Sequence, residues 1–76
     1  MKSAPQIDRL IAELDKQSDQ ELAFWLADYG SPLARYRLCN DVFNAGANEL
    51  FWRLAYFTGR LNNGAQPGEL FPLALG

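Results

Sequence analysis

The stretch from residue 36 to residue 61, YRLCNDVFNAGANELFWRLAYFTGRL, constrains the fold most, because it carries most of the apolar surface and keeps one helical phase throughout. Large apolar residues recur every seven positions, others follow four positions later, and together they form one narrow stripe. The stripe consists of Tyr36, Phe43, Ala47, Leu50, Leu54, Phe57 and Leu61. We expect it to face the core. Trp52, Tyr56 and Gly59 lie on the opposite side, so this central helix has two faces to cover.

Length and composition predict a single globular domain spanning residues 1–76. With 76 residues, the chain is near the lower size limit at which a domain buries enough surface to fold alone. It is 49% hydrophobic, 13% aromatic and 21% charged, which is a globular rather than a disordered profile. So much aromatic surface in a small domain indicates either an unusually aromatic core or a patch that a partner covers.

Charge and cysteine content narrow the class of protein further. The formal net charge of −2 disfavours nucleic acid as the partner. Cys39 is the single cysteine and has no partner for an internal disulfide, which favours a reducing compartment. The N-terminus lacks the apolar run of a signal peptide, and no stretch approaches the ~20 apolar residues of a membrane span. We therefore expect a soluble cytoplasmic protein without membrane contact.

Two short helices are predicted before the central stretch. The first covers about residues 4–16, starts from a capping box between Ser3 and Gln6, and has an apolar face. The second covers about residues 19–29, starts from a capping box between Ser18 and Glu21, and ends at Gly30. The loop between them is so short that they form either an antiparallel hairpin or a sharp corner. Phe24 points to the solvent side of the second helix and needs a cover.

The third helix begins at Ser31-Pro32, a cap followed by proline at the first helical position, and covers about residues 32–61. Two alternatives remain open for its middle. Constant phase across Gly46 favours one long helix, because a glycine inside a helix costs only about 1 kcal/mol. The residues Ala45-Gly46 instead favour a break near 45–47 and a new cap at Asn44 or Asn48.

The tail, residues 62–76, is apolar and interrupted by proline, which predicts an extended segment. Its large side chains, among them Leu70 and Phe71, need a surface to pack on. The tail either folds back over the aromatic face of its own chain or crosses to a second chain. The fold class predicted overall is all-α: a small helical bundle with an N-terminal helical hairpin, a long or broken third helix and an extended apolar tail.

No residue pattern indicates catalysis, a cofactor or a metal. Histidine is absent, and the single cysteine has no metal-ligand spacing around it. No glycine-rich stretch matches a phosphate-binding loop. Cys39 is best interpreted as a small buried apolar residue, and the carboxylates as solvated helix faces. We therefore predict that the protein is not an enzyme.

Arginines and aromatic residues supply the candidate binding surface. The basic set consists of Arg35, Arg37, Arg53 and Arg60, and an alternative function as a nucleic-acid-associated helical protein rests on it. Tyr, Trp and Arg are enriched at protein-binding hot spots, so the central helix's second face is the stronger candidate. The predicted partner-binding residues are Phe24, Trp52, Arg53, Tyr56, Arg60, Leu70 and Phe71.

The function expected from these features is that of a small protein-protein interaction module. Its partner is either a larger protein or a second copy of the same chain in a homodimer. Small acidic chains without catalytic residues often serve bacteria and phages as adaptors or inhibitors of other proteins, and this analogy suggests the same role here.

Overall fold

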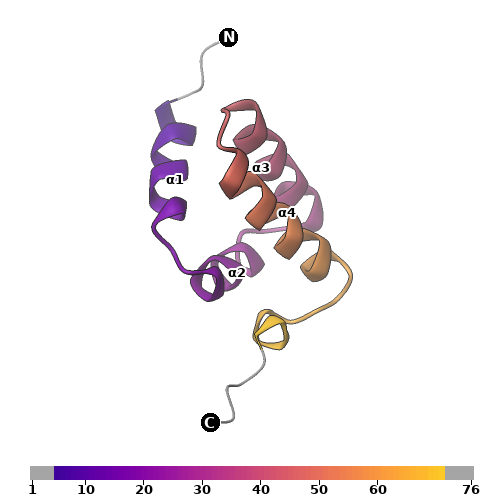
Figure 1. Cartoon of the computed structure of the whole chain (residues 1–76). Helices are drawn as coiled ribbons and strands as arrows, with labels where there is room; N and C mark the ends of the chain where they lie inside the picture. The colour runs from indigo at the N-terminus through magenta and orange to yellow at the C-terminus, as the bar shows by residue number, and fades with distance from the viewer. Residues whose placement is uncertain (1–4, 72–76) are drawn as a thin grey trace.

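The computed structural model describes residues 5–71 and contains four α-helices and one 3₁₀-helix within that range (Figure 1). The helices are α1 (Pro5–Asp15), α2 (Asp19–Ala27), α3 (Pro32–Asn44), α4 (Asn48–Asn62) and the 3₁₀-helix η1 (Pro67–Leu70). The prediction of a small all-α bundle is confirmed. The predicted cap at Ser3 and the last tail residues, 72–76, lie outside the described residues.

Side-chain caps start α2 and α3 where the sequence predicts them. The Ser18 hydroxyl accepts a hydrogen bond from the Glu21 amide at 3.2 Å, and the Glu21 carboxylate accepts one from the Ser18 amide at 2.9 Å. The Ser31 hydroxyl accepts from the Ala34 amide at 3.2 Å, with Pro32 in the first turn of α3. These bonds satisfy amides that have no partner within their own helix.

The third predicted helix is broken, and the interpretation as one long helix is wrong. Gly46 has a φ of 86°, a left-handed conformation in which an L side chain is strained. The Gly46 amide donates to the Phe43 carbonyl at 3.0 Å, and the Ala47 amide donates to the Val42 carbonyl at 3.3 Å. This bond pair is the Schellman motif that ends a helix. It completes α3 and reverses the chain into α4.

The break changes which side of α3 faces the core. Leu38, Cys39 and Val42 are buried, whereas Tyr36 and Phe43 are 58% and 53% exposed. The predicted core stripe is therefore wrong for α3. The loop at residues 45–47 resets the helical register, so a shared phase in the sequence does not place the two halves on one face.

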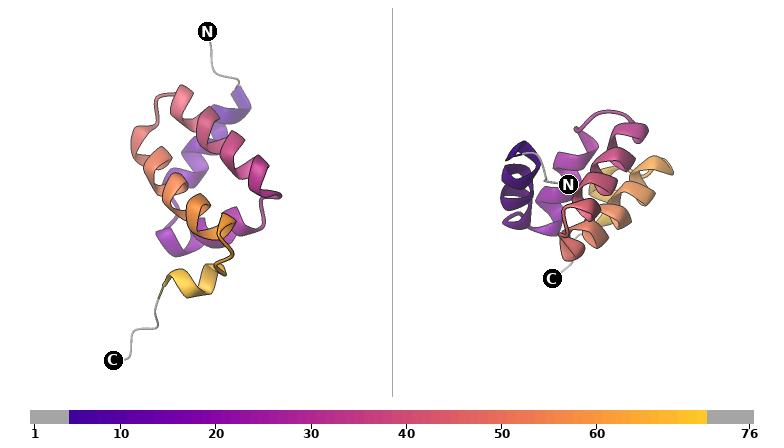
Figure 2. Two further views of the ribbon diagram at one scale, coloured as in Figure 1. Left: turned by 90° about the vertical axis from the view of Figure 1, so that its right-hand side faces the viewer. Right: turned by 90° about the horizontal axis from the view of Figure 1, so that it is seen from above.

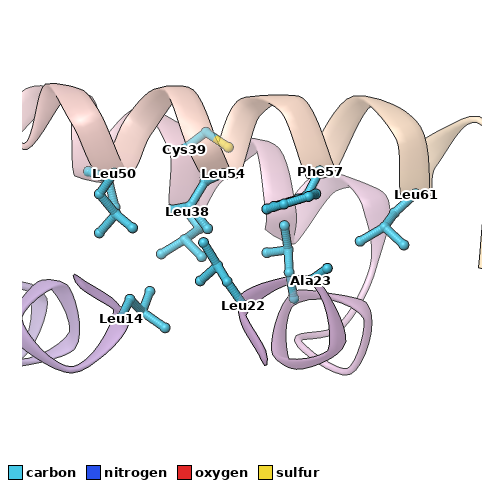
Figure 3. Packing of buried hydrophobic residues seen from close by; sticks show 11 residues of the cluster. Leu14, Leu22, Ala23, Leu38, Cys39, Leu50, Leu54, Phe57 and Leu61 are labelled. Carbon is cyan, nitrogen blue, oxygen red and sulfur yellow. The ribbon is translucent and has the colours of Figure 1, made fainter. Parts of the chain in front are cut away.

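The predicted stripe is correct for α4 and forms the centre of the core. Its buried members point toward Leu14 of α1 and toward Leu22 and Ala23 of α2 (Figure 3). These α4 residues are Leu50, Leu54, Phe57 and Leu61. Because one side of α4 contacts three other helices, α4 is the central element of the bundle.

The helices form two layers. The antiparallel pair α3 and α4 makes one layer, and α1 and α2 lie behind it (Figure 2, left). Helix α2 runs across the end of α1, so the connection between them is the sharp corner rather than the antiparallel hairpin (Figure 1).

The first part of the tail folds back onto its own chain. The prediction of an extended tail is wrong for residues 67–70, which form η1 and contact α2. Pro67 lies in the first turn of η1, and the Glu69 carboxylate accepts a hydrogen bond from the Gln66 amide at 2.6 Å. Phe71 follows, with its ring centroid 5.7 Å from that of Phe57. Among the described tail residues, the apolar side chains therefore pack in cis.

Candidate protein-binding surface

A groove of about 340 Å³ lies between α4, the start of α2 and η1. We call it the Trp52 groove. Its lining residues are Asp19, Trp52, Arg53, Tyr56, Phe57, Leu70 and Phe71. Three separate segments of the chain build it, so it exists only in the folded protein.

The walls and base of the Trp52 groove are aromatic. Phe57 is only 4% exposed and lies at the base, where its ring contacts those of Tyr56 and Phe71. Trp52 and Tyr56 are one helical turn apart on α4 and are 69% and 55% exposed. The groove therefore has a supported base and two large aromatic side chains free to contact another molecule.

Arg53 holds the α4 side of the groove against α2. Its Nε donates to the Asp19 carboxylate at 2.8 Å, and its Nη2 donates to the Gln17 carbonyl at 2.7 Å. Asp19 opens α2, so this pair joins the N-terminus of α2 to the middle of α4. Because the guanidinium donates to two separate acceptors, the Arg53 side chain is restricted and shapes one wall of the groove.

Arg60 extends the same face by one further turn of α4. Its guanidinium lies 5.9 Å from the centre of the Tyr56 ring, and its Nη1 donates to the Tyr56 hydroxyl at 3.2 Å. This contact restricts the Tyr56 ring by a weak cation-π interaction and a hydrogen bond.

Most of the predicted partner-binding residues meet in this region. Trp52, Arg53, Tyr56, Leu70 and Phe71 line the groove, and Arg60 contacts Tyr56. Phe24 is half exposed on α2, as expected for the solvent side of that helix, but it does not line the groove.

Sequence reasoning missed two of the lining residues, Asp19 and Phe57. In the sequence, Asp19 looks like an ordinary acidic residue in the first turn of a helix. Its ion-pair partner, Arg53, lies 34 residues further along the chain. No local signal reveals such a contact. Phe57 belongs to the predicted core stripe, and only the packing of Phe71 against it makes it part of a surface.

The four arginines do not form a common basic surface. Arg35 donates to the carbonyls of Leu26 and Ala27 at 3.0 Å each and to the Asn62 side chain at 2.8 Å. Arg53 is bound as described above. Both guanidinium groups hold helices together, while Arg37 and Arg60 are exposed on different helices.

Cys39 has the environment of a structural residue. It is buried, and its sulfur lies 3.4 Å from the Thr58 hydroxyl oxygen, also buried. Among residues 5–71, no group of three or more His, Cys, Asp or Glu side chains is placed to hold a metal ion. Within the same range, no helix combines the length and the apolar character needed to cross a lipid bilayer.

Comparison of the chain with protein-family models, with curated proteins and with solved structures gave no match in any of the three.

Proposed function

We propose that this chain is a non-enzymatic protein-binding module that uses the Trp52 groove to bind an apolar segment of a larger protein. The observation that carries the proposal is the exposure of Trp52 and Tyr56 over a base supported by Phe57 and Phe71. Hot spots of protein interfaces combine such aromatic anchors with nearby arginines.

The size of the groove favours a protein segment over an enclosed small molecule. Its volume of about 340 Å³ is near the lower limit of roughly 300 Å³ for pockets that enclose a small ligand. The groove is open to solvent rather than enclosed, which suits the insertion of a few apolar side chains from a partner that also contacts the rim.

The charges at the groove support a binding role. The Arg53 guanidinium donates to the Asp19 carboxylate at 2.8 Å, and this ion pair shapes the rim of the groove. Because this pair is preformed within the module, a partner meets an ordered rim and does not have to order these side chains on binding.

Selection from a library of displayed random 12-residue peptides tests the proposal. The folded wild-type chain is the bait, and enriched peptides are synthesised and measured by fluorescence anisotropy. Trp52→Ala should weaken their binding by roughly 30-fold, the loss typical of a hot-spot residue.

Tyr36→Ala is the matched control for Tyr56→Ala. The two tyrosines are almost equally exposed, at 58% and 55%, but only Tyr56 lines the groove. We expect Tyr56→Ala to reduce peptide binding and Tyr36→Ala to leave it unchanged. The proposal is wrong if no peptide is enriched, or if the enriched peptides bind the Trp52→Ala variant as tightly as the wild-type chain.

A further inference from the structure

The charged side chains around the Trp52 groove differ in whether an opposite charge accompanies them. Arg53 and Asp19 form an ion pair at 2.8 Å. The Glu69 carboxylate, in η1, accepts a hydrogen bond from the Gln66 amide. Arg60 has no carboxylate oxygen within 4.0 Å of its guanidinium nitrogens among residues 5–71. No described acid therefore neutralises the charge of Arg60.

Tyr56 holds the Arg60 guanidinium at the edge of the groove. The Arg60 Nη1 donates to the Tyr56 hydroxyl at 3.2 Å, and the guanidinium carbon lies 5.9 Å from the centre of the ring. Both side chains are exposed, and Tyr56 lines the groove. A guanidinium carries more N–H donors than this one bond uses. Arg60 thus offers donors to a molecule that enters the groove.

The Tyr56 hydroxyl supplies a second donor beside the guanidinium. Because arginine has no acceptor, the hydroxyl oxygen accepts in this contact and its hydrogen is left to donate. Among the described residues, the Tyr56 hydroxyl donates no hydrogen bond. Two neighbouring donors, one of them cationic, suit an anion with two acceptor atoms, and a carboxylate is such an anion.

From this arrangement we infer that the protein segment bound in the Trp52 groove carries an aspartate or glutamate whose carboxylate binds Arg60 and the Tyr56 hydroxyl. The inference rests on the proposed function, because it names the chemistry of the segment that the groove accepts. Apolar side chains of the segment contact Trp52 and Phe71, and the acidic side chain lies at the rim, where interfaces place their charged groups.

A single carboxylate fits this rim better than the phosphates of a nucleic acid. Binding to a nucleic-acid backbone uses several cations along the strand. Arg53 is already paired with Asp19, which leaves Arg60 as the arginine available at the groove within residues 5–71. The formal net charge of −2 also opposes a polyanion. One available guanidinium matches one acidic side chain.

The peptides enriched by selection on the wild-type chain test this inference. Each is synthesised with an acetylated N-terminus and an amidated C-terminus, so that only side chains carry charge. We expect the peptides to combine apolar residues with an aspartate or glutamate. Replacing that acid with its amide should raise the dissociation constant about tenfold, at the low end for a hydrogen-bonded charge because the rim is exposed.

Variants of Arg60 test the same contact from the side of the protein. Arg60→Gln should also weaken binding about tenfold. Arg60→Lys should weaken it less, because an ammonium group keeps the charge but not the planar fork. Arg60→Glu should reverse the preference, so that a peptide with lysine in place of the acid binds more tightly than the original peptide.

Arg37 provides the matched controls, because it is an exposed arginine on α3 that does not line the groove. Arg37→Gln and Arg37→Glu change the net charge by the same amounts as the corresponding Arg60 variants. They should bind the original peptide like the wild-type chain and keep its preference for the acid. Circular dichroism should show native helix content in every variant.

The outcomes distinguish this inference from the proposed function. If no peptide is enriched, both are wrong. If the enriched peptides need Trp52 but lack an acidic residue, or bind Arg60→Gln as tightly as Arg37→Gln, only the carboxylate contact is wrong. A single-stranded oligonucleotide that displaces the peptides at the concentrations that they themselves require would also overturn the inference, because the rim would then bind phosphate.

Discussion

Replacing Arg35 tests the inference that one guanidinium joins three helices. Its Nε and Nη2 donate to the carbonyls of Leu26 and Ala27 at the C-terminus of α2, and its Nη1 donates to the Asn62 side chain at the end of α4. Those carbonyls are among the ones that a helix leaves without an internal partner, and a cation there also interacts favourably with the helix dipole.

The expected magnitude follows from the three bonds of 3.0 Å or shorter. A bond from a charged donor contributes about 1.5 to 3 kcal/mol when buried, but water can reach this partly buried site and replace part of each bond. Counting about 1 kcal/mol for each bond gives a loss of about 3 kcal/mol for Arg35→Met, which keeps the apolar stem and removes the donors. For a domain of this size, the melting temperature should fall by about 12 to 24 °C.

Urea denaturation followed by far-UV circular dichroism measures the free energy of unfolding of each variant. Arg37→Met is the matched control, because Arg37 is an exposed arginine on the same helix. Arg35→Lys should fall between the wild-type chain and Arg35→Met, since an ammonium group keeps the charge but cannot reach several acceptors with one planar fork. If Arg35→Met and Arg37→Met unfold within about 0.5 kcal/mol of each other, the assignment of Arg35 as a helix-joining residue is wrong.

Two further predictions concern the core and the chain reversal. Leu54→Ala should lower the free energy of unfolding by about 2 to 5 kcal/mol, because Leu54 is fully buried at the centre of α4. Leu33→Ala, at an exposed position of α3, should change the free energy of unfolding by less than about 0.5 kcal/mol. Equal losses for the two variants in urea denaturation would contradict the assigned core. Gly46→Ala should cost about 1 kcal/mol because of its positive φ, and Gly68→Ala, at an open glycine without a positive φ, should cost nothing. A thermal melt in which both glycine variants behave alike would count against the Schellman turn between α3 and α4.

Local chemistry in the sequence was enough to predict the helical class, the starts of α2 and α3, and the buried side of α4. Each of these depends on residues a few positions apart: Ser18 with Glu21, Ser31 with Pro32, and leucines at helical spacing. The aromatic and arginine side of α4 could be recognised in the same way, because Trp52 and Tyr56 share one face of a single helix.

Tertiary structure decided the rest, because it depends on contacts between distant parts of the chain. Gly46 ends α3 instead of lying inside a long helix, because the chain reversal there lets α4 pack against α3 and α2. As a result, Tyr36 and Phe43, which the sequence placed in the core, lie on the surface. The Arg53 to Asp19 pair and the Phe71 to Phe57 contact likewise join separate segments, and together they turn an aromatic helix face into a groove. Helical periodicity reports which residues share a side, whereas only packing determines which side is buried.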